Sequence, residues 1–313
     1  MTRTRHRDTP TVSVILPTYN RPELLGRAVD SVLSQTHRAI ECIVVDSASM
    51  TPASQALADV ADERLTIIRL EDDDGLQHAK NVGIGNATGE YLAFLDDDDV
   101  WLPEKLERQL RFVNARQVDG CVTLKRVVDE EGTTIPDTGY MSRYRALMGD
   151  LKTQPMSTLL IRRKPVTEID GFDESFPFQH EDREFCVRIL DRASIGVLEA
   201  PLIEVHRDGR TPFPEPDALI EGKRALLNKH EELLSSFSLL DQRRILSFNR
   251  LELALSLCHH GEPKRSLALF RRALVPPVLS PQQYLFYLAV FSRTLFSNGV
   301  RGYVPFVEQT EAE

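Results

Sequence analysis

Short apolar segments alternate with amphipathic helical segments along the first hundred residues of the chain. Apolar runs predict strands at Val12–Leu16, Ile40–Val45, Leu65–Leu70 and Tyr91–Leu95. The segments between them have the apolar spacing of helices, at Pro22–Leu33, Pro52–Ala61 and Gly75–Gly85. Because strands separated by helices pair in parallel through right-handed crossovers, this order predicts an α/β fold. We expect a Rossmann-like, mainly parallel central sheet with helices on both faces.

The remaining chain divides into a less regular continuation and an all-helical part. We expect a helix at 100–113, a strand at 120–128, a loop at Gly132–Pro155, a strand at Ser157–Ile161 and a helix at Glu181–Leu190. Three prolines within Thr211–Pro216 end this domain. Four amphipathic helices are predicted after it, at Asp217–Ser236, Leu240–His259, Lys264–Leu274 and Pro281–Asn298. The predicted organisation is a frayed tail at 1–10, an α/β domain at 11–212 and a helical extension at 213–313.

Composition restricts the class of protein. With 42% hydrophobic and 27% charged residues over 313 positions, the chain resembles a soluble globular protein, and its net charge of −9 argues against general nucleic-acid binding. The cysteines are isolated from one another and predict neither a disulfide framework nor a zinc site. No apolar stretch approaches the ~20 residues of a membrane helix. We therefore expect a cytoplasmic protein.

The helical extension carries a local excess of positive charge. Residues 240–305 contain nine basic side chains and three acidic ones, although the whole chain is acidic. This excess predicts a surface for peripheral contact with anionic lipid at the inner face of a membrane, or with a phosphorylated acceptor. A solvated helix face is the alternative, and self-association is a further role open to these helices.

Four consecutive aspartates, Asp96 to Asp99, follow the predicted strand Tyr91–Leu95. The acids thus lie at the carboxyl end of a strand, where open α/β sheets bind their ligands. Carboxylates about 5 Å apart repel by about 3 kcal/mol per pair at an effective dielectric constant near ~20. A divalent cation that is completed by substrate phosphates would offset this repulsion. The alternative is a solvated acidic turn that caps the next helix.

Several short segments together resemble the family 2 glycosyltransferases of the GT-A fold. They match in order and spacing over about residues 12–206. The segments are Val12–Arg21, Val44–Asp46, Ala79–Asn81, Gly89–Pro103, Gly171–Glu174 and His180–Asp182. The resemblance implies an inverting transferase that takes a sugar from a nucleoside-diphosphate donor, with a UDP-linked donor favoured. The implied acceptor is a hydroxyl of a glycan or of a lipid-linked glycan.

The resemblance also implies a nucleotide-sugar site in the first half of the chain. Lys80 would face the diphosphate, and Asp46 would accept a hydrogen bond from the base. The turn after the first strand would contact the nucleotide through Pro17, Thr18, Tyr19 and Asn20. The alternatives are a helix cap for Asn20 and an exposed helix position for Lys80. The family usually has a second acid and a glycine after Asp46, whereas this chain has Ser47. This position therefore does not identify the nucleotide base of the donor.

The metal ligands and the catalytic base are implied in the same way. The family's Asp-x-Asp pattern maps onto Asp96 and Asp98, whose side chains share one face of the strand end. Asp96 or Asp97 would reach the ribose or a metal-bound water, and Asp98 would bind Mn²⁺ or Mg²⁺ with His206 as a further ligand. The family's general base maps onto Glu181–Asp182, with Asp182 favoured and Glu181 as the alternative.

Two other functions are compatible with parts of this pattern. Residues 95–100 also fit the nucleophile motif of haloacid-dehalogenase-type phosphatases, in which Asp96 would attack phosphorus. That motif normally follows the first strand, whereas here three strands precede it. A transferase fold without activity, serving as a sugar-binding scaffold, is the second alternative. Hydrolysis of a nucleotide sugar in the presence of Mn²⁺ distinguishes the three.

Overall fold

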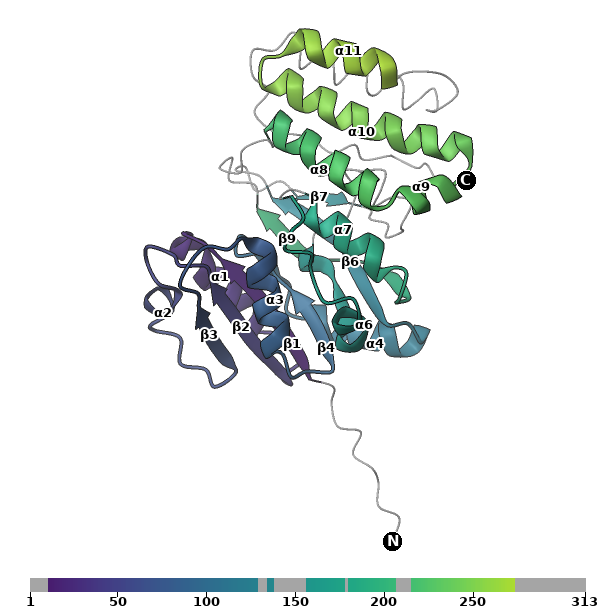
Figure 1. The fold of residues 1–313 in the computed structure, drawn as a ribbon. Coiled ribbons are helices and arrows are strands. Elements are labelled where there is room, and N and C mark those ends of the chain that lie inside the picture. The colour runs from purple at the N-terminus through teal and green to yellow at the C-terminus, as the bar shows by residue number, and fades with distance from the viewer. Residues whose placement is uncertain (1–10, 129–133, 138–155, 178–179, 207–214, 274–313) are drawn as a thin grey trace. The chain divides into compact units, whose positions relative to one another are not determined.

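The computed structural model describes residues 11–128, 134–137, 156–177, 180–206 and 215–273 (Figure 1). These residues form two compact units. The α/β unit comprises residues 11–128, 134–137, 156–174 and 192–206, and the helical unit comprises 175–177, 180–191 and 215–273. Helix Glu181–Ile189, which the sequence places in the α/β domain, groups with the C-terminal helices.

One mixed sheet of nine strands organises the α/β unit, in the order β3-β2-β1-β4-β8-β6-β9-β5, with β7 paired to β6. The first four strands of this order are parallel, and β4 pairs with β8 in antiparallel fashion. The strands are β1 (Val12–Thr18), β2 (Ile40–Asp46), β3 (Leu65–Arg69), β4 (Tyr91–Phe94), β5 (Asp99–Trp101), β6 (Gly120–Val128), β7 (Thr134–Asp137), β8 (Leu160–Arg162) and β9 (Ile195–His206).

Alternate residues of a strand point to opposite faces of the sheet, so the apolar side chains on each face pack against helices. Val12, Val14 and Leu16 of β1 join a core that includes the apolar side of helix α1. On the other face, helix α3 approaches β1 closely at Gly83. A Cβ atom added to Gly83 would lie only 2.4 Å from a methyl carbon of Ile15. The helices of this unit are α1 (Pro22–Leu33), α2 (Ala53–Ala56), α3 (Leu76–Asn86), α4 (Lys105–Arg116) and α6 (Arg163–Glu168), with a 3₁₀ turn at Met156–Thr158.

The helical unit consists of α7 (Glu181–Ile189), α8 (Pro216–Lys229), α9 (Glu231–Ser236), α10 (Leu239–His259) and α11 (Pro263–Ala273). Its core joins residues from α7, α8 and α10, among them Val187, Leu226 and Ile245. Within the part of the chain that the structure describes, no helix is long and apolar enough to cross a membrane.

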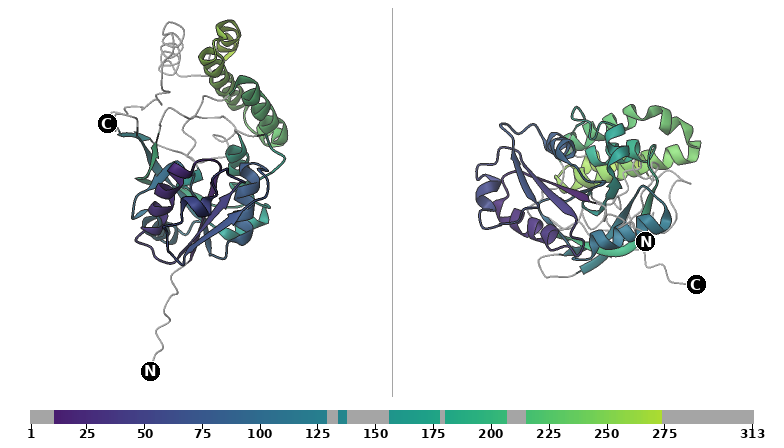
Figure 2. Two further views of the ribbon diagram at one scale, coloured as in Figure 1. Left: turned by 90° about the vertical axis from the view of Figure 1, so that its left-hand side faces the viewer. Right: turned by 90° about the horizontal axis from the view of Figure 1, so that it is seen from below.

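The structure confirms the strand and helix order predicted through residue 95, although the helix expected at Pro52–Ala61 ends at Ala56, and it differs in further details afterwards. Figure 2 shows the ribbon from two further sides. The helix expected at 100–113 is wrong at its start, since residues 99–101 form β5 and α4 begins at Lys105. The helix expected at 217–236 ends at Lys229 and resumes at Glu231. Strand β7 lies within the segment expected to be a loop, α6 was not predicted, and the helix expected at Pro281–Asn298 falls outside the described residues.

Candidate nucleotide-sugar site

The carboxyl ends of β1, β2 and β4 meet at one edge of the sheet. Thr18, the last residue of β1, pairs with Asp46, the last residue of β2. β4 pairs with β1 up to Phe94, and the four aspartates follow one residue later. Parallel pairing therefore brings the predicted site residues from three separate segments together at this edge.

Two turns at this edge are bonded to each other. The Asn20 backbone N–H donates to Ser49 Oγ (2.9 Å), and Asn20 Oδ1 accepts from the Met50 backbone N–H (2.7 Å). Asn20 adopts a left-handed backbone (φ 54°), a conformation that asparagine tolerates better than most residues. The helix-cap alternative for Asn20 is wrong, because Arg21 holds the N-cap position of α1 and Asn20 bonds across to the second turn. Beside it, the Tyr19 side chain is 49% exposed.

Asp46 shapes the second turn. Its Oδ1 accepts from the Ser49 N–H, and its Oδ2 accepts from the Ala53 N–H (2.9 Å each) and from Arg69 Nη1 (2.7 Å). Burial disfavours the carboxylate, but these hydrogen bonds and the Arg69 charge outweigh it and lower the pKa of Asp46. Asp46 is fully buried, so contact between this carboxylate and a nucleotide base stays a prediction.

Two neighbouring carboxylates of the tetrad share an arginine. Asp97 Oδ2 accepts from Thr18 Oγ1 (2.8 Å), and its Oδ1 lies 3.1 Å from Arg21 Nη1. The same guanidinium nitrogen lies 3.2 Å from Asp98 Oδ2. Burial is the largest influence on Asp97 and raises its pKa despite the Thr18 and Arg21 contacts. Arg21 therefore supplies part of the positive charge that the sequence predicts beside the aspartates.

The other two aspartates lie near Ser157. Ser157 Oγ is 3.2 Å from the Asp96 backbone nitrogen and 3.3 Å from Asp96 Oδ2. Asp99 is 4% exposed, and burial together with the nearby Asp96 charge raises the pKa of Asp99 well above its usual value. A carboxyl group in such a place favours its neutral form, so Asp99 carries less of the charge than its position in the sequence suggests.

Strand pairing brings His206 to the aspartates. Asp99 of β5 pairs with Val205 of β9, and His206 is the next residue of β9. Burial and the Arg27 charge lower the pKa of His206, whereas the Asp98 carboxylate acts in the opposite direction. The buried Nε2 atom of His206 has no hydrogen-bond partner within the described residues, and Glu204 Oε2 is 3.8 Å from it.

Asp98 and His206 fit a divalent cation in their chemistry. A carboxylate oxygen and an unsatisfied imidazole nitrogen are donors that Mn²⁺ accepts, and substrate phosphates and waters complete such sites in many enzymes. Among the described residues no cluster of three or more histidine, cysteine or acidic side chains could hold a metal ion by itself. A metal ion bound here would therefore have few protein ligands.

Lys80 lies on the inner side of α3. Its side chain is fully buried, and its Nζ lies 4.9 Å from the centroid of the Phe172 ring. The alternative of an exposed helix lysine is therefore wrong. Phe172 belongs to the Gly171–Glu174 segment, which Asn81 holds by accepting from the Phe172 N–H and donating to its carbonyl oxygen (2.8 Å each). A role for Lys80 at the diphosphate stays a prediction.

The two candidates for the general base begin helix α7 of the helical unit. Glu181 is buried (7% exposed), whereas Asp182 is half-buried. The structure describes the α/β and helical units separately, so the role of this pair stays a prediction. Arg183 and Glu184, which follow in the same turn, both form ion pairs with residues of the C-terminal helices.

Sequence reasoning missed Arg21, Ser157 and Asp99 as members of the site. Arg21 is the last residue of the Val12–Arg21 segment, three positions after β1, and that place was the available signal. Nothing in the sequence pairs Ser157 with Asp96, because the contact spans 61 positions. Asp99 was visible as the fourth acid, but its burial comes from strand β5, which the sequence did not predict.

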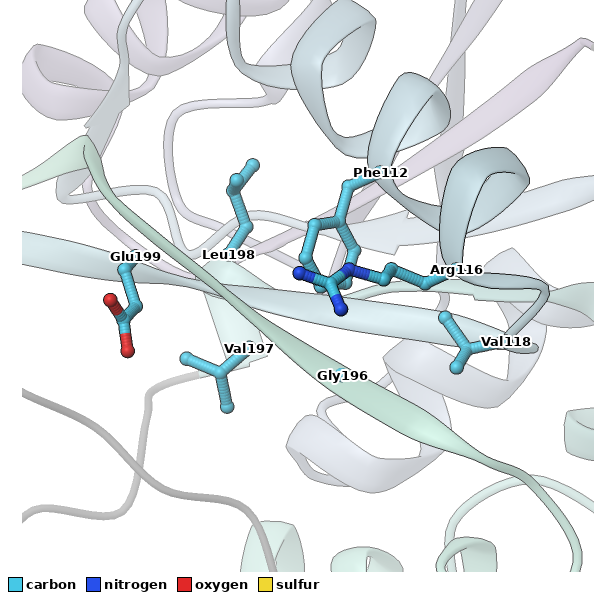
Figure 3. Close-up of a pocket in the computed structure, with 7 residues that line it drawn as sticks. All are labelled: Phe112, Arg116, Val118, Gly196, Val197, Leu198 and Glu199. Atoms are coloured by element: carbon cyan, nitrogen blue, oxygen red, sulfur yellow. The ribbon is translucent and has the colours of Figure 1, made fainter.

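A separate groove of about 680 Å³ lies elsewhere on the α/β unit (Figure 3). It is lined by the C-terminal part of α4 and the start of β9, from Gly196 to Glu199. His206 ends the same strand seven residues after Glu199, roughly 20 Å away at about 3.3 Å per residue. None of the predicted site residues lines this groove.

Comparison with known proteins decides the family. The sequence matches the family model described as glycosyl transferase family 2 over residues 13–169, half of the chain. The chain belongs to glycosyl transferase family 2. This membership removes the phosphatase alternative, and it agrees with Asp96 following the fourth strand of the chain and not the first.

Family 2 relatives are found among bacterial proteins. An uncharacterised glycosyltransferase of Rickettsia felis is 31% identical over 239 residues, which cover 72% of this chain and 38% of that protein. Bacillus subtilis TuaG, provisionally named a teichuronic acid biosynthesis glycosyltransferase, is 38% identical over 128 residues, which cover 40% of this chain and 51% of that protein. The chain thus spans about half or less of the length of these two relatives.

Solved structures share the GT-A fold that the sequence predicts. Staphylococcus aureus TarS 1-349, in complex with UDP-GlcNAc, has a TM-score of 0.57 at 19% identity, covering 84% of this chain and 90% of that chain. The mannosyltransferase PcManGT of Pyrobaculum calidifontis, in complex with GDP-Man and Mn²⁺, has a TM-score of 0.54 at 19% identity, covering 93% and 88%. Identities this low show the fold alone.

Proposed function

We propose that this family 2 protein is a metal-dependent inverting glycosyltransferase. It transfers a sugar from a nucleoside-diphosphate donor to a hydroxyl of a glycan or of a lipid-linked glycan. The observation that carries the proposal is the pairing of β5 with β9, which sets Asp99 opposite Val205, so that Asp98 and His206 are the next residues on the two strands and the Asp98 charge acts on His206. Arg21, which follows the turn after β1, pairs with Asp98. Folding alone does not explain why the buried His206 Nε2 atom lacks a hydrogen-bond partner among the described residues near a cluster of carboxylates, whereas binding of a cation would.

Asp98 and His206 would hold Mn²⁺ or Mg²⁺. When bound, the cation neutralises negative charge on the two phosphates and on the departing nucleoside diphosphate. Asp97 is held by Thr18 and Arg21, and Asp96 lies beside Ser157, so both carboxylates are fixed near the place where the ribose would bind. Mn²⁺ is the cation named with the mannosyltransferase neighbour, which favours testing it first.

A UDP-linked donor is favoured over a GDP-linked one. The TarS neighbour was solved with UDP-GlcNAc and also with UDP, although the mannosyltransferase neighbour was solved with GDP-Man. The turns bonded through Asn20 form the proposed base side of the site, where the exposed Tyr19 ring offers a surface for stacking. The Pro17 to Asn20 segment would supply the backbone around the base.

Asp182 is the proposed general base, which takes the proton from the attacking hydroxyl as the sugar carbon inverts. Its greater exposure favours it over Glu181, because a base must reach the acceptor oxygen to within about 3 Å. The acceptor is proposed to be presented at the inner face of a membrane. The exposed basic residues of α11, such as Lys264 and Arg271, support electrostatic attraction to anionic headgroups.

A donor screen tests the proposal. UDP- and GDP-sugars are incubated with the full chain, with and without Mn²⁺, and thermal stability and release of nucleoside diphosphate are measured. We expect one donor class to raise the melting temperature and to be hydrolysed, both dependent on Mn²⁺. Binding without turnover would favour the scaffold, and an absence of both would refute the enzyme assignment.

Two substitutions separate the proposed roles. Asp98→Ala should abolish metal-dependent binding of the donor, whereas the exposed Asp59→Ala should leave that binding unchanged. Asp182→Asn should bind Mn²⁺ and UDP normally and lose at least about 100-fold in turnover, which is typical for loss of a general base. Normal turnover by Asp182→Asn would move the base to Glu181 or to another residue.

A further inference from the structure

Helix α7, whose first turn contains Asp182, is bonded to the C-terminal helices through partly to largely buried ion pairs. Arg183 donates from Nη2 to Glu252 Oε1 (3.0 Å) and from Nη1 to Glu252 Oε2 (3.2 Å), so α7 is joined to α10 by a bidentate pair. The Arg183 and Glu252 side chains are 13% and 12% exposed. A planar guanidinium with two parallel bonds fixes orientation as well as distance.

A second cation reaches the same carboxylate from another helix. Lys223 of α8 forms an ion pair with Glu252 and donates to Asn249 Oδ1 (3.1 Å). Although burial disfavours its charge, the two cations outweigh this effect and lower the pKa of Glu252. Lys223 does not lie on α7, so it stabilises Glu252 without itself contributing a bond between α7 and α10.

The residue after Arg183 makes a separate link. Glu184 Oε1 lies 2.7 Å from Lys229 Nζ at the end of α8. Near the start of α7, α8 also approaches closely, since a Cβ on Gly222 would lie 2.9 Å from His180 Cδ2. The first turn of α7 thus contacts two helices that come later in the chain, α8 and α10.

Such bonds are more specific than apolar packing. A hydrophobic contact tolerates small shifts and rotations of a helix, whereas a buried charge that loses its partner is left uncompensated. The Arg183–Glu252 pair is therefore one of the contacts that determine the orientation of the α7 first turn. Because Asp182 precedes Arg183 directly, its carboxylate direction depends on the same orientation.

We propose that the Arg183–Glu252 ion pair is a positioning device for Asp182, and that the helical unit takes part in catalysis by orienting the base. The inference rests on the proposed function, in which Asp182 accepts the proton. Arg183 and Glu252 are positioning residues, because they act through Asp182 and not on the substrate. The extension is then required for the chemical step even when the acceptor is a small molecule.

Two matched variants test this inference in the full chain. Arg183→Met and Lys223→Met each remove one cation from Glu252, but only Arg183→Met breaks the bond from α7 to α10. Turnover is measured as release of UDP from UDP-GlcNAc in the presence of Mn²⁺, with water as the acceptor. If the donor screen selects GDP-mannose, release of GDP is measured instead. Affinity for UDP with Mn²⁺ and hydrogen exchange of the α7 amides are measured on the same samples.

We expect Arg183→Met to lower kcat by about 10- to 100-fold, as a small misplacement of a catalytic group does, with nucleotide affinity within about twofold of the wild type. Exchange of the α7 amides should be faster in this variant. Lys223→Met should lower the melting temperature and keep kcat within about threefold. Arg183→Lys, which retains the charge and one bond, should recover part of the lost kcat.

The outcomes separate this inference from the proposed function. If Arg183→Met and Lys223→Met lose equal stability and both keep kcat, the ion pair is structural and the inference is overturned, whereas the proposed function still stands on Asp182→Asn. If Asp182→Asn keeps its turnover, the assignment of the base fails, and the inference fails with it.

Discussion

The carboxylate of Glu184 gives the most quantitative prediction about the helical unit. Its oxygens lie 2.7 to 2.8 Å from Arg188 Nε and Nη2 and from Lys229 Nζ, and its side chain is 1% exposed. Burial opposes the charged form, but the nearby His230, Arg188 and Lys229 side chains outweigh it and lower the pKa of Glu184 to about 2. Relative to its ordinary value of 4.5, this shift corresponds to about 3 kcal/mol of stability at neutral pH.

Replacing Glu184 by glutamine removes the charge at nearly constant volume. Since the folded pKa lies below the unfolded one, the carboxylate contributes fully above pH 4.5, and the contribution is lost as the pH falls toward about 2. Glu184→Gln should therefore be less stable than the wild type by about 3 kcal/mol at pH 7 and by about 1.5 kcal/mol at pH 3.

Urea unfolding at both pH values, followed by far-UV circular dichroism, measures this difference. The fluorescence of Trp101, the one tryptophan of the sequence, reports on the α/β unit separately. Glu232→Gln, an exposed substitution in α9, is the control and should change stability by less than about 0.5 kcal/mol. A loss below about 1 kcal/mol at pH 7, or a loss that does not change with pH, would refute the reasoning.

Two further predictions concern the α/β unit. Arg21→Met should bind Mn²⁺ about fivefold more tightly in calorimetry, because a partly exposed ion pair of about 1 kcal/mol no longer occupies Asp98; unchanged or weaker binding would contradict this. Lys105 is fully buried, and burial lowers its pKa to about 7. Between about pH 7 and 10.5 the unfolded chain therefore binds more protons at Lys105 than the folded chain does. From pH 7 to pH 9 the free energy of unfolding of the wild type should rise by roughly 2 to 3 kcal/mol relative to that of Lys105→Met. Urea unfolding that gives the same pH profile for both proteins would contradict this.

The first four strands could be predicted because local and long-range requirements agree there. Each apolar run is short and bounded by a helix with a clear apolar side, such as α1 with Leu25, Val29 and Val32 on its buried face. Parallel pairing then follows from the order of elements. Strand β5 could not be predicted in this way, since three residues carry no periodicity and their pairing partner lies about a hundred positions later.

The chemistry of the site could be predicted in kind but not in detail. The repulsion among the aspartates predicted a positive partner, and the structure places Arg21 beside Asp97 and Asp98, whereas binding of a cation by Asp98 and His206 stays a proposal. Lys80 shows the opposite limit: a lysine near the start of a helix has no local signal for burial, and the contact with Phe172 depends on a segment more than 90 positions away. The ion pair between α7 and α10 also could not be predicted from local sequence patterns, because its residues lie 69 positions apart.

The tetrad of aspartates divides into different roles through its neighbours, and this division explains why one of its members is the best candidate ligand. Asp97 is engaged by Thr18 and Arg21, Asp96 lies against Ser157, and Asp99 is buried in a place that favours its neutral form. Asp98 keeps a side chain that is 30% exposed, and this side chain pairs with the partly exposed Arg21. A cation can displace such a partner at low cost, whereas removing Asp97 or Asp99 from its surroundings would break buried bonds or expose a buried group. Under the proposed function, Asp98 would therefore be the one adaptable ligand, whereas the other three aspartates are bonded to neighbours or buried.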